Sequence, residues 1–160
     1  MKARHIIALW FVLGALYLVI ESIWRGWTHV SMLVVGGICG LAIGAVNQIP
    51  SFYETKMIWQ SITVAAIILC VEFGSGCVIN LWWGWGIWDY SGVWGNIMGQ
   101  ICLPFAALWV LITPFAIWAE DTARWSIYDW YTRRQLDPGK PPKYAPYSLR
   151  SVYKELFTGR

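Results

Sequence analysis

The stretch "MIWQSITVAAIILCVEFGSGCVINLWW", residues 57–83, decides the fold class of this chain. It contains no Lys, Arg or Asp, and Glu72 is its one carboxylate. A helix that crosses a lipid bilayer needs about 20 mostly apolar residues. The stretch therefore predicts a membrane-spanning helix that carries a single acidic side chain.

Three further apolar runs of similar length cover approximately residues 6–23, 30–49 and 97–119. Hydrophobic residues make up 58% of the 160-residue chain and charged residues 13%, which is too apolar for an ordinary soluble domain. We therefore predict an all-α membrane protein. Residues 1–123 form a four-helix transmembrane domain, and residues 124–160 form a cytoplasmic amphipathic tail.

The basic residues predict the orientation of these helices. Lys2, Arg4 and Lys56 fall on one side of the membrane together with eight Lys and Arg residues that follow residue 119, whereas Arg25 falls on the other side. Basic residues gather on the cytoplasmic side, so both termini should be cytoplasmic in a multi-pass protein of the cell membrane. The net charge of +3 comes mainly from the tail, which indicates contact with anionic membrane lipids rather than with nucleic acid.

Polar residues from different segments fall within one layer of the predicted bundle. At 1.5 Å per residue, Glu21 and Glu72 both lie roughly 22 Å above the cytoplasmic ends of their helices, in the outer half of the bilayer. Other polar side chains fall at the same level. The candidate residues for binding a substrate or ion are Glu21, Arg25, Glu72, Asn80, Asp89, Asn96 and Gln100.

Two interpretations of this polar layer remain open. A charged side chain in a membrane helix is costly unless it is paired, hydrated or neutralised. Three carboxyls against Arg25 leave an excess of negative charge, so either some carboxyls are protonated or the layer holds a cation, water or a polar ligand. In the alternative interpretation, Arg25 simply pairs with Glu21 or Asp89, and the surrounding Trp residues form an interfacial belt.

The segment "NLWWGWGIWDYSGVWGN", residues 80–96, is too rich in Gly for a regular helix and too apolar for a free loop. One interpretation is a re-entrant segment at the outer membrane face, which is permissible where its backbone is shielded or faces water. Gly95 and Gly99 fall at the predicted start of the fourth helix, and Pro104 and Pro114 inside it predict a bend.

The second predicted helix carries small residues every four positions, at Gly36, Gly40 and Gly44. This spacing lets two helix backbones approach closely in lipid. The stripe is either a packing face within the chain or an interface between two copies.

The tail begins with "RWSIYDWYTRRQL", residues 124–136, whose mixture of aromatic and basic residues is typical of a segment at the membrane surface. A Pro-rich linker follows. The last residues form an amphipathic helix that must dock on the membrane surface, on the chain's own helices or on a cytosolic partner. Its apolar face consists of Leu149, Val152, Tyr153, Leu156 and Phe157.

Common catalytic motifs are missing from the sequence. There is no GxxxxGK[ST] phosphate loop, no HExxH and no GxSxG, and the four Cys residues have no CxxC spacing. His5 and His29 stand alone at predicted membrane boundaries. We therefore expect a chain that is not an enzyme and that holds no metal and no cofactor.

Several blocks of the sequence resemble the small bacterial membrane proteins grouped as ABC-transporter type IV, or CmpB-like, proteins. The most specific block is "IWDYSGVWGNIMGQICL"; the others are "IESIWRG", "SMLVVGGICG", "EFGSGCVIN" and "YSLRSVYKELF". The resemblance covers most of the chain. It implies a four-helix membrane protein, and it places the family's recurrent polar positions on the seven candidate residues named above.

The resemblance also implies a transport-related, permease-like subunit. A separate ATPase would supply the energy and would dock on the C-terminal helix, and four helices per chain would require an oligomer, with the Gly36, Gly40 and Gly44 face as its candidate contact. Two alternatives stay open. The first is a self-sufficient, homo-oligomeric small transporter or channel that uses Glu21, Glu72 and Asp89; the second is a non-catalytic membrane scaffold that contacts lipid or stabilises a partner.

Overall fold

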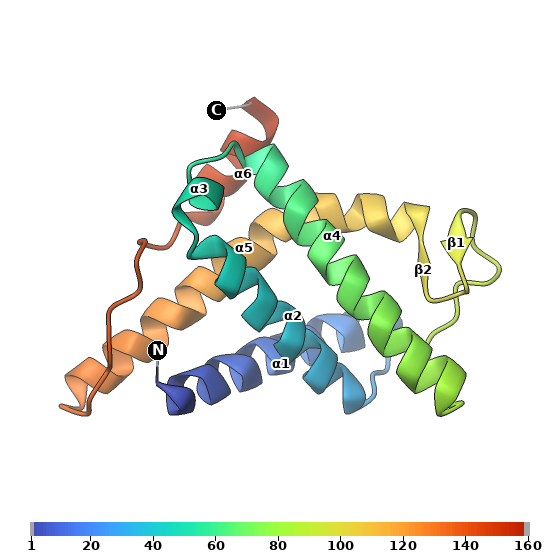
Figure 1. The fold of residues 1–160 in the computed structure, drawn as a ribbon, viewed down its shortest axis with the longest axis horizontal. Coiled ribbons are helices and arrows are strands. Elements are labelled where there is room, and N and C mark those ends of the chain that lie inside the picture. The colour runs from blue at the N-terminus through green and yellow to red at the C-terminus, as the bar shows by residue number, and fades with distance from the viewer. Residues whose placement is uncertain (1, 159–160) are drawn as a thin grey trace.

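The computed structural model describes residues 2–158, and helices make up most of the chain (Figure 1). The helices are α1 (Ala3–Arg25), α2 (Ser31–Asn47), the short α3 (Pro50–Tyr53), α4 (Met57–Gly76), α5 (Leu103–Arg133) and α6 (Leu149–Thr158). A wider π-helical turn, η1 (Cys77–Trp82), continues α4, and a small hairpin joins β1 (Asn96–Ile97) to β2 (Ile101–Cys102).

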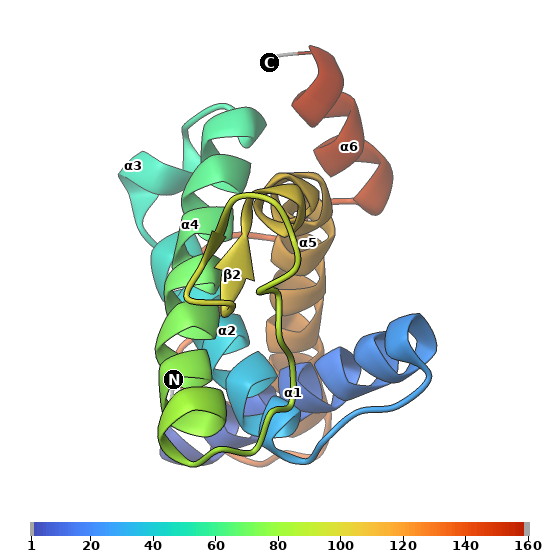
Figure 2. The same cartoon turned by 90° about the vertical axis from the view of Figure 1, so that its right-hand side faces the viewer.

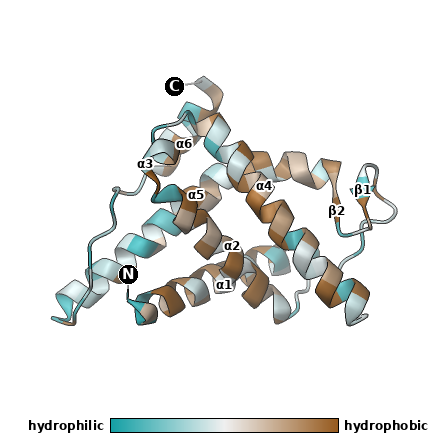
Figure 3. Cartoon of the chain, in the orientation of Figure 1, coloured by the Kyte–Doolittle hydropathy of each residue, from teal (hydrophilic) through white to brown (hydrophobic). Residues whose placement is uncertain are grey.

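Three helical segments are long and apolar enough to cross a membrane, namely Ala3–Arg25, Met57–Trp82 and Leu103–Arg133. The helix α2 is also apolar but has only 17 residues. Large apolar side chains such as Ile7, Ile23 and Trp59 lie exposed on the outside of these helices, and Figure 3 shows hydrophobic residues along α1, α2 and α4. Apolar surface of this extent is typical of contact with lipid, which agrees with the predicted membrane class.

Glycines allow α2 to lie directly on its neighbours. A Cβ atom added to Gly36 would overlap Tyr17 of α1, and one added to Gly40 would overlap Leu13 of the same helix. A Cβ atom on Gly44 would overlap Glu120 and Arg124 of α5. The chain's own side chains therefore fill the face of this glycine stripe.

The fourth long helix differs from its predicted range of 97–119 at both ends. Gly95 and Gly99 have φ angles of 68° and 69°, in the left-handed region, so the backbone before α5 is not helical. The helix starts at Leu103, with Pro104 in its first turn, where the missing N–H leaves no hydrogen bond unmade. It then runs through Pro114 to Arg133 without a break, so most of the predicted surface segment is part of this helix.

The segment between η1 and α5 folds back over the ends of α4 and α5, as Figure 2 shows for the hairpin. Trp88 is buried, and its indole Nε1–H donates to the Gln100 carbonyl oxygen at 3.0 Å. A Cβ atom on Gly76 of α4 would lie 2.5 Å from Gln100 Oε1. The missing side chain at Gly76 thus lets this segment seat closely on α4.

The tail docks on the chain's own helices. Val152 and Leu156 are buried against α4 and α5, and the Tyr153 hydroxyl donates to the Leu111 carbonyl oxygen at 3.4 Å. Leu149 and Phe157 stay exposed. The linker before α6 is also held, because the Tyr53 and Tyr144 rings stack at 3.9 Å, and Lys2 and Arg4 both bond to Asp137.

We expect the substitution Gly36→Ala to destabilise the protein by about 1–3 kcal/mol, because the added methyl group overlaps Tyr17 in a packed interface. The matched control is Gly74→Ala on α4, where a Cβ atom meets nothing within 4 Å. That control should be neutral or stabilising by up to about 1 kcal/mol, because Ala favours helix over Gly. Thermal unfolding in detergent measures both, and equal melting temperatures would contradict the close approach of α1 and α2.

Candidate functional site

A cavity of about 400 Å³ lies between α1, α4, α5 and the segment after η1. Its wall includes three carboxylates and one guanidinium, which come from Glu21, Glu72, Asp89 and Arg25. Aromatic rings make up much of the remaining wall, and they belong to Tyr17, Trp24, Trp88, Tyr90, Phe105 and Trp109. Four of the seven residues predicted to bind a ligand therefore meet at one cavity.

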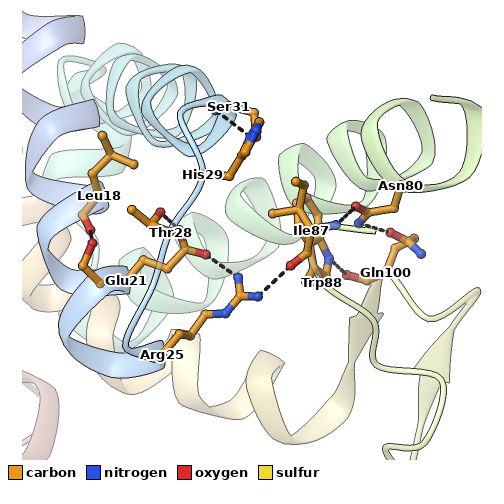
Figure 4. Close-up of polar contacts among 11 residues, drawn as sticks. Leu18, Glu21, Arg25, Thr28, His29, Ser31, Asn80, Ile87, Trp88 and Gln100 are labelled. Carbon is orange, nitrogen blue, oxygen red and sulfur yellow. Dashed lines mark hydrogen bonds and ion pairs between the residues drawn. The ribbon is translucent and has the colours of Figure 1, made fainter. Parts of the chain in front are cut away.

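Arg25 joins the end of α1 to the segment after η1. Its Nη1 lies 2.7 Å from Glu21 Oε1, one helical turn earlier, and its Nη2 donates to the Ile87 carbonyl oxygen at 2.6 Å (Figure 4). The guanidinium also lies over the Trp27 ring at 4.4 Å, and the Thr28 hydroxyl donates to the second oxygen of Glu21. Of the two predicted ion pairs, the one with Glu21 is present, and Asp89 has a different role.

Of the three carboxylates in the cavity wall, Glu72 has the fewest partners among the described residues. Its side chain is 8% exposed and accepts one hydrogen bond, from Trp109 Nε1–H to Oε2 at 3.1 Å. Among the described residues, Glu72 forms no ion pair, and its Oε1 accepts no hydrogen bond. A buried carboxylate without a cation is costly, so this group is either protonated or paired with something inside the cavity.

Asp89 lies exposed at the rim of the cavity and holds a turn. It accepts hydrogen bonds from the Ser91 N–H at 2.8 Å and from the Ser91 hydroxyl at 3.0 Å. A Cβ atom on Gly99 would lie 2.7 Å from Asp89 Oδ1, so the backbone of the hairpin passes close to this carboxylate. Asp89 thus both shapes the turn and adds negative charge to the rim.

The three amide residues of the predicted set do not line the cavity. Asn80 Nδ2 donates to Gln100 Oε1 at 2.8 Å, and Asn80 Oδ1 accepts from the Ile87 N–H at 2.7 Å (Figure 4). Asn96 donates to the carbonyl oxygens of Ser91 and Val93. Contrary to the predicted helix range of 97–119, Gln100 lies in the hairpin, as Asn96 does. All three amides position the segment that carries Trp88, Asp89 and Tyr90.

From the sequence, Trp24 and Trp88 are interpreted as part of an interfacial belt, and the other four aromatic residues of the wall are not singled out. One signal was available, because Tyr17 lies four residues before Glu21 and so shares its helix face. Burial is the main cause that raises the pKa of Tyr90 to about 12, and the nearby Glu72 carboxyl is the second. The Tyr90 phenol therefore stays protonated at neutral pH and presents a neutral hydroxyl.

A second buried polar cluster was missed because Glu120 and Asp121 fall just beyond residue 119, where the fourth helix was predicted to end. Asn47, Glu120 and Asp121 are each at most 1% exposed. Asn47 Nδ2 donates to Asp121 Oδ1 at 2.7 Å, and Arg124 Nε donates to Glu120 Oε1 at 2.7 Å. The cluster links the end of α2 to α5, directly beside Gly44.

Residues 8–132 match the protein family described as "Putative ABC-transporter type IV". The chain belongs to this family. The predicted resemblance is thereby confirmed, and the matched range includes every residue of the cavity wall and of the Asn47 cluster but not α6. No curated protein and no solved structure gives a significant match. Family membership and the apolar helices together identify a membrane protein related to ABC transporters.

We expect Asn47→Ala to destabilise the protein by about 1–3 kcal/mol, because it removes the hydrogen-bond donor of the buried Asp121 carboxyl. The control is Thr63→Ala on α4, where an exposed side chain makes no hydrogen bond within the part of the chain that the structure describes. Thermal unfolding in the same detergent compares the two. If both variants have the melting temperature of the wild type, the Asn47 contact does not hold α2 to α5.

Proposed function

We propose that the chain is a transport-related, permease-like membrane subunit whose cavity binds a small molecule during its passage across the bilayer. The observation that carries this proposal concerns Glu72, a buried carboxylate on a helix long and apolar enough to cross the membrane. Its side chain faces the cavity and has no ion-pair partner in residues 2–158. Ionisable residues inside membrane segments generally serve substrate, ion or proton pathways. Membership of a transporter family supports the same role.

In this proposal the chain crosses the membrane four times and has both termini in the cytoplasm. With 17 residues, α2 extends about 25 Å, a little less than the hydrocarbon thickness of about 30 Å, and local thinning of the bilayer accommodates such a difference. The excess of Lys and Arg near residues 2–4, at Lys56 and after residue 123 supports this orientation. The cavity then lies in the outer half of the membrane.

The chain has no phosphate-loop motif, so in this proposal it binds and conducts rather than catalyses, and a separate ATPase supplies the energy. The exposed residues of α6 are the proposed contact. Val152 and Leu156 already pack on α4 and α5, whereas Phe157 is 76% exposed and Leu149 39%. An oligomer of this chain would use a face other than the glycine stripe of α2, which α1 and α5 occupy.

Glu72 also favours a second candidate function. A carboxyl that is free to change its protonation or its partner inside the membrane suits a self-sufficient, homo-oligomeric transporter driven by protons or cations. Native mass spectrometry after gentle extraction from the source membranes separates the two candidates. An ATPase chain in fixed stoichiometry supports the ABC subunit, whereas a homo-oligomer without an ATPase supports the self-sufficient transporter. Recovery of isolated monomers would contradict both.

We expect the double substitution Leu149→Ser and Phe157→Ser to reduce the amount of co-purified ATPase without lowering the melting temperature, because both side chains are exposed. The matched variant is Val152→Ser on the same helix, whose side chain is fully buried. It should lower the melting temperature, because it removes buried apolar contact and leaves a hydroxyl in its place. If the exposed pair can be changed with no loss of ATPase, α6 is not the docking element.

A further inference from the structure

The geometry of the cavity points to a ligand class: we propose that it binds an organic cation, such as an ammonium group that carries apolar substituents. This inference rests on the proposed function, because it names the ligand of the same cavity. Three features of the wall support it, namely the balance of charge, the aromatic faces and the absence of a metal-binding cluster from the described residues.

The balance of charge in the wall favours a cation. Arg25 already has partners, since Glu21, the Ile87 carbonyl oxygen and the Trp27 ring each contact its guanidinium. Glu21 balances its charge, so this pair adds no net positive charge to the wall. The remaining charged groups are Glu72 in the wall and Asp89 at the rim, both carboxylates. A bound cation would supply the ion-pair partner that Glu72 lacks among the described residues.

The aromatic residues of the wall suit an organic ion. Two pairs of rings line the cavity, with Tyr17 and Trp109 stacked at 6.4 Å and Tyr90 and Phe105 stacked at 4.8 Å. The faces of such rings attract cations, and aromatic cages are a recurrent means of binding quaternary ammonium groups. Trp109 also donates to Glu72, so the aromatic wall and the carboxylate adjoin each other.

An inorganic ion fits this wall less well. Metal cations such as Ca²⁺ require six to eight oxygen ligands, and residues 2–158 contain no group of three or more His, Cys, Asp or Glu side chains placed to hold a metal ion. The volume of about 400 Å³ falls within the range of small-molecule sites, about 300–1,000 Å³. The hydroxyls of Tyr17 and Tyr90, which have no hydrogen-bond partner in the described part of the chain, can accept a hydrogen bond from a protonated amine.

The test uses the full chain in a mild detergent and follows the melting temperature as a function of probe concentration, because a ligand that binds only the folded state raises it. The cationic probes are tetraethylammonium and choline. The neutral probe is 3,3-dimethylbutan-1-ol, which has the shape of choline without its charge, and the anionic probe is trimethylacetate. Ionic strength is held constant with NaCl.

We expect at least one cationic probe to raise the melting temperature of the wild type saturably, and the neutral and anionic probes to have no such effect. Glu72→Gln preserves an acceptor for Trp109 and should weaken binding of the cation at least tenfold. Tyr90→Leu removes a ring outside the spanning helices and should also weaken it. The matched control is Glu54→Gln, an exposed carboxylate away from the cavity, which should bind like the wild type.

The inference is overturned if no cationic probe stabilises the wild type, or if the Glu72 and Tyr90 variants bind it as the wild type does. It is also overturned if the neutral or anionic probe binds in a way that depends on Glu72 and Tyr90, although the proposed function would then stand with another ligand. Co-purification of the ATPase is measured on the same preparation. If a cation binds but no ATPase co-purifies, only the proposed role as an ABC subunit is contradicted. If an ATPase co-purifies but no cation binds, only this inference is contradicted.

Discussion

The contact of Arg25 with Glu21 and with the Ile87 carbonyl oxygen is the interaction on which the cavity depends. A guanidinium among apolar residues is costly unless it is paired or hydrated, and here Arg25 finds its partners within the protein. Glu21 balances its charge from the same helix, and the carbonyl oxygen comes from a distant segment. One charged side chain thereby anchors the segment after η1, which in turn places Trp88 and Tyr90 in the wall.

A second constraint acts at the other end of the bundle, where α2 must approach α5 closely enough to bury Asn47, Glu120 and Asp121. Gly44 makes this possible, because any side chain there would occupy the space of Glu120 and Arg124. The two polar sites differ in consequence. In the far cluster, Asn47 donates to Asp121 and so links α2 to α5. In the described part of the chain, Glu72 instead lines a cavity and accepts one hydrogen bond, from Trp109.

The amide residues illustrate how a polar position can serve a site without touching its contents. Asn80, Asn96 and Gln100 direct their hydrogen bonds to the backbone and to each other, and so give a Gly-rich segment one conformation. Gly95 and Gly99 complete this arrangement with left-handed backbone angles that other residues adopt only with strain. The polarity of residues 87–102 is therefore mainly the means by which a loop holds its shape against the membrane helices.

The sequence by itself determined the membrane class, the family and the helical range near 57–83, because these follow from local hydrophobicity and from motif identity. It also picked out Glu21, Arg25, Glu72 and Asp89, since charges in apolar surroundings are conspicuous. Only the tertiary structure decided where α5 begins, which neighbours fill the glycine stripe and that Glu120 and Asp121 are buried. Those outcomes depend on contacts between residues far apart in the chain, and the local pattern of hydrophobic residues does not specify such contacts.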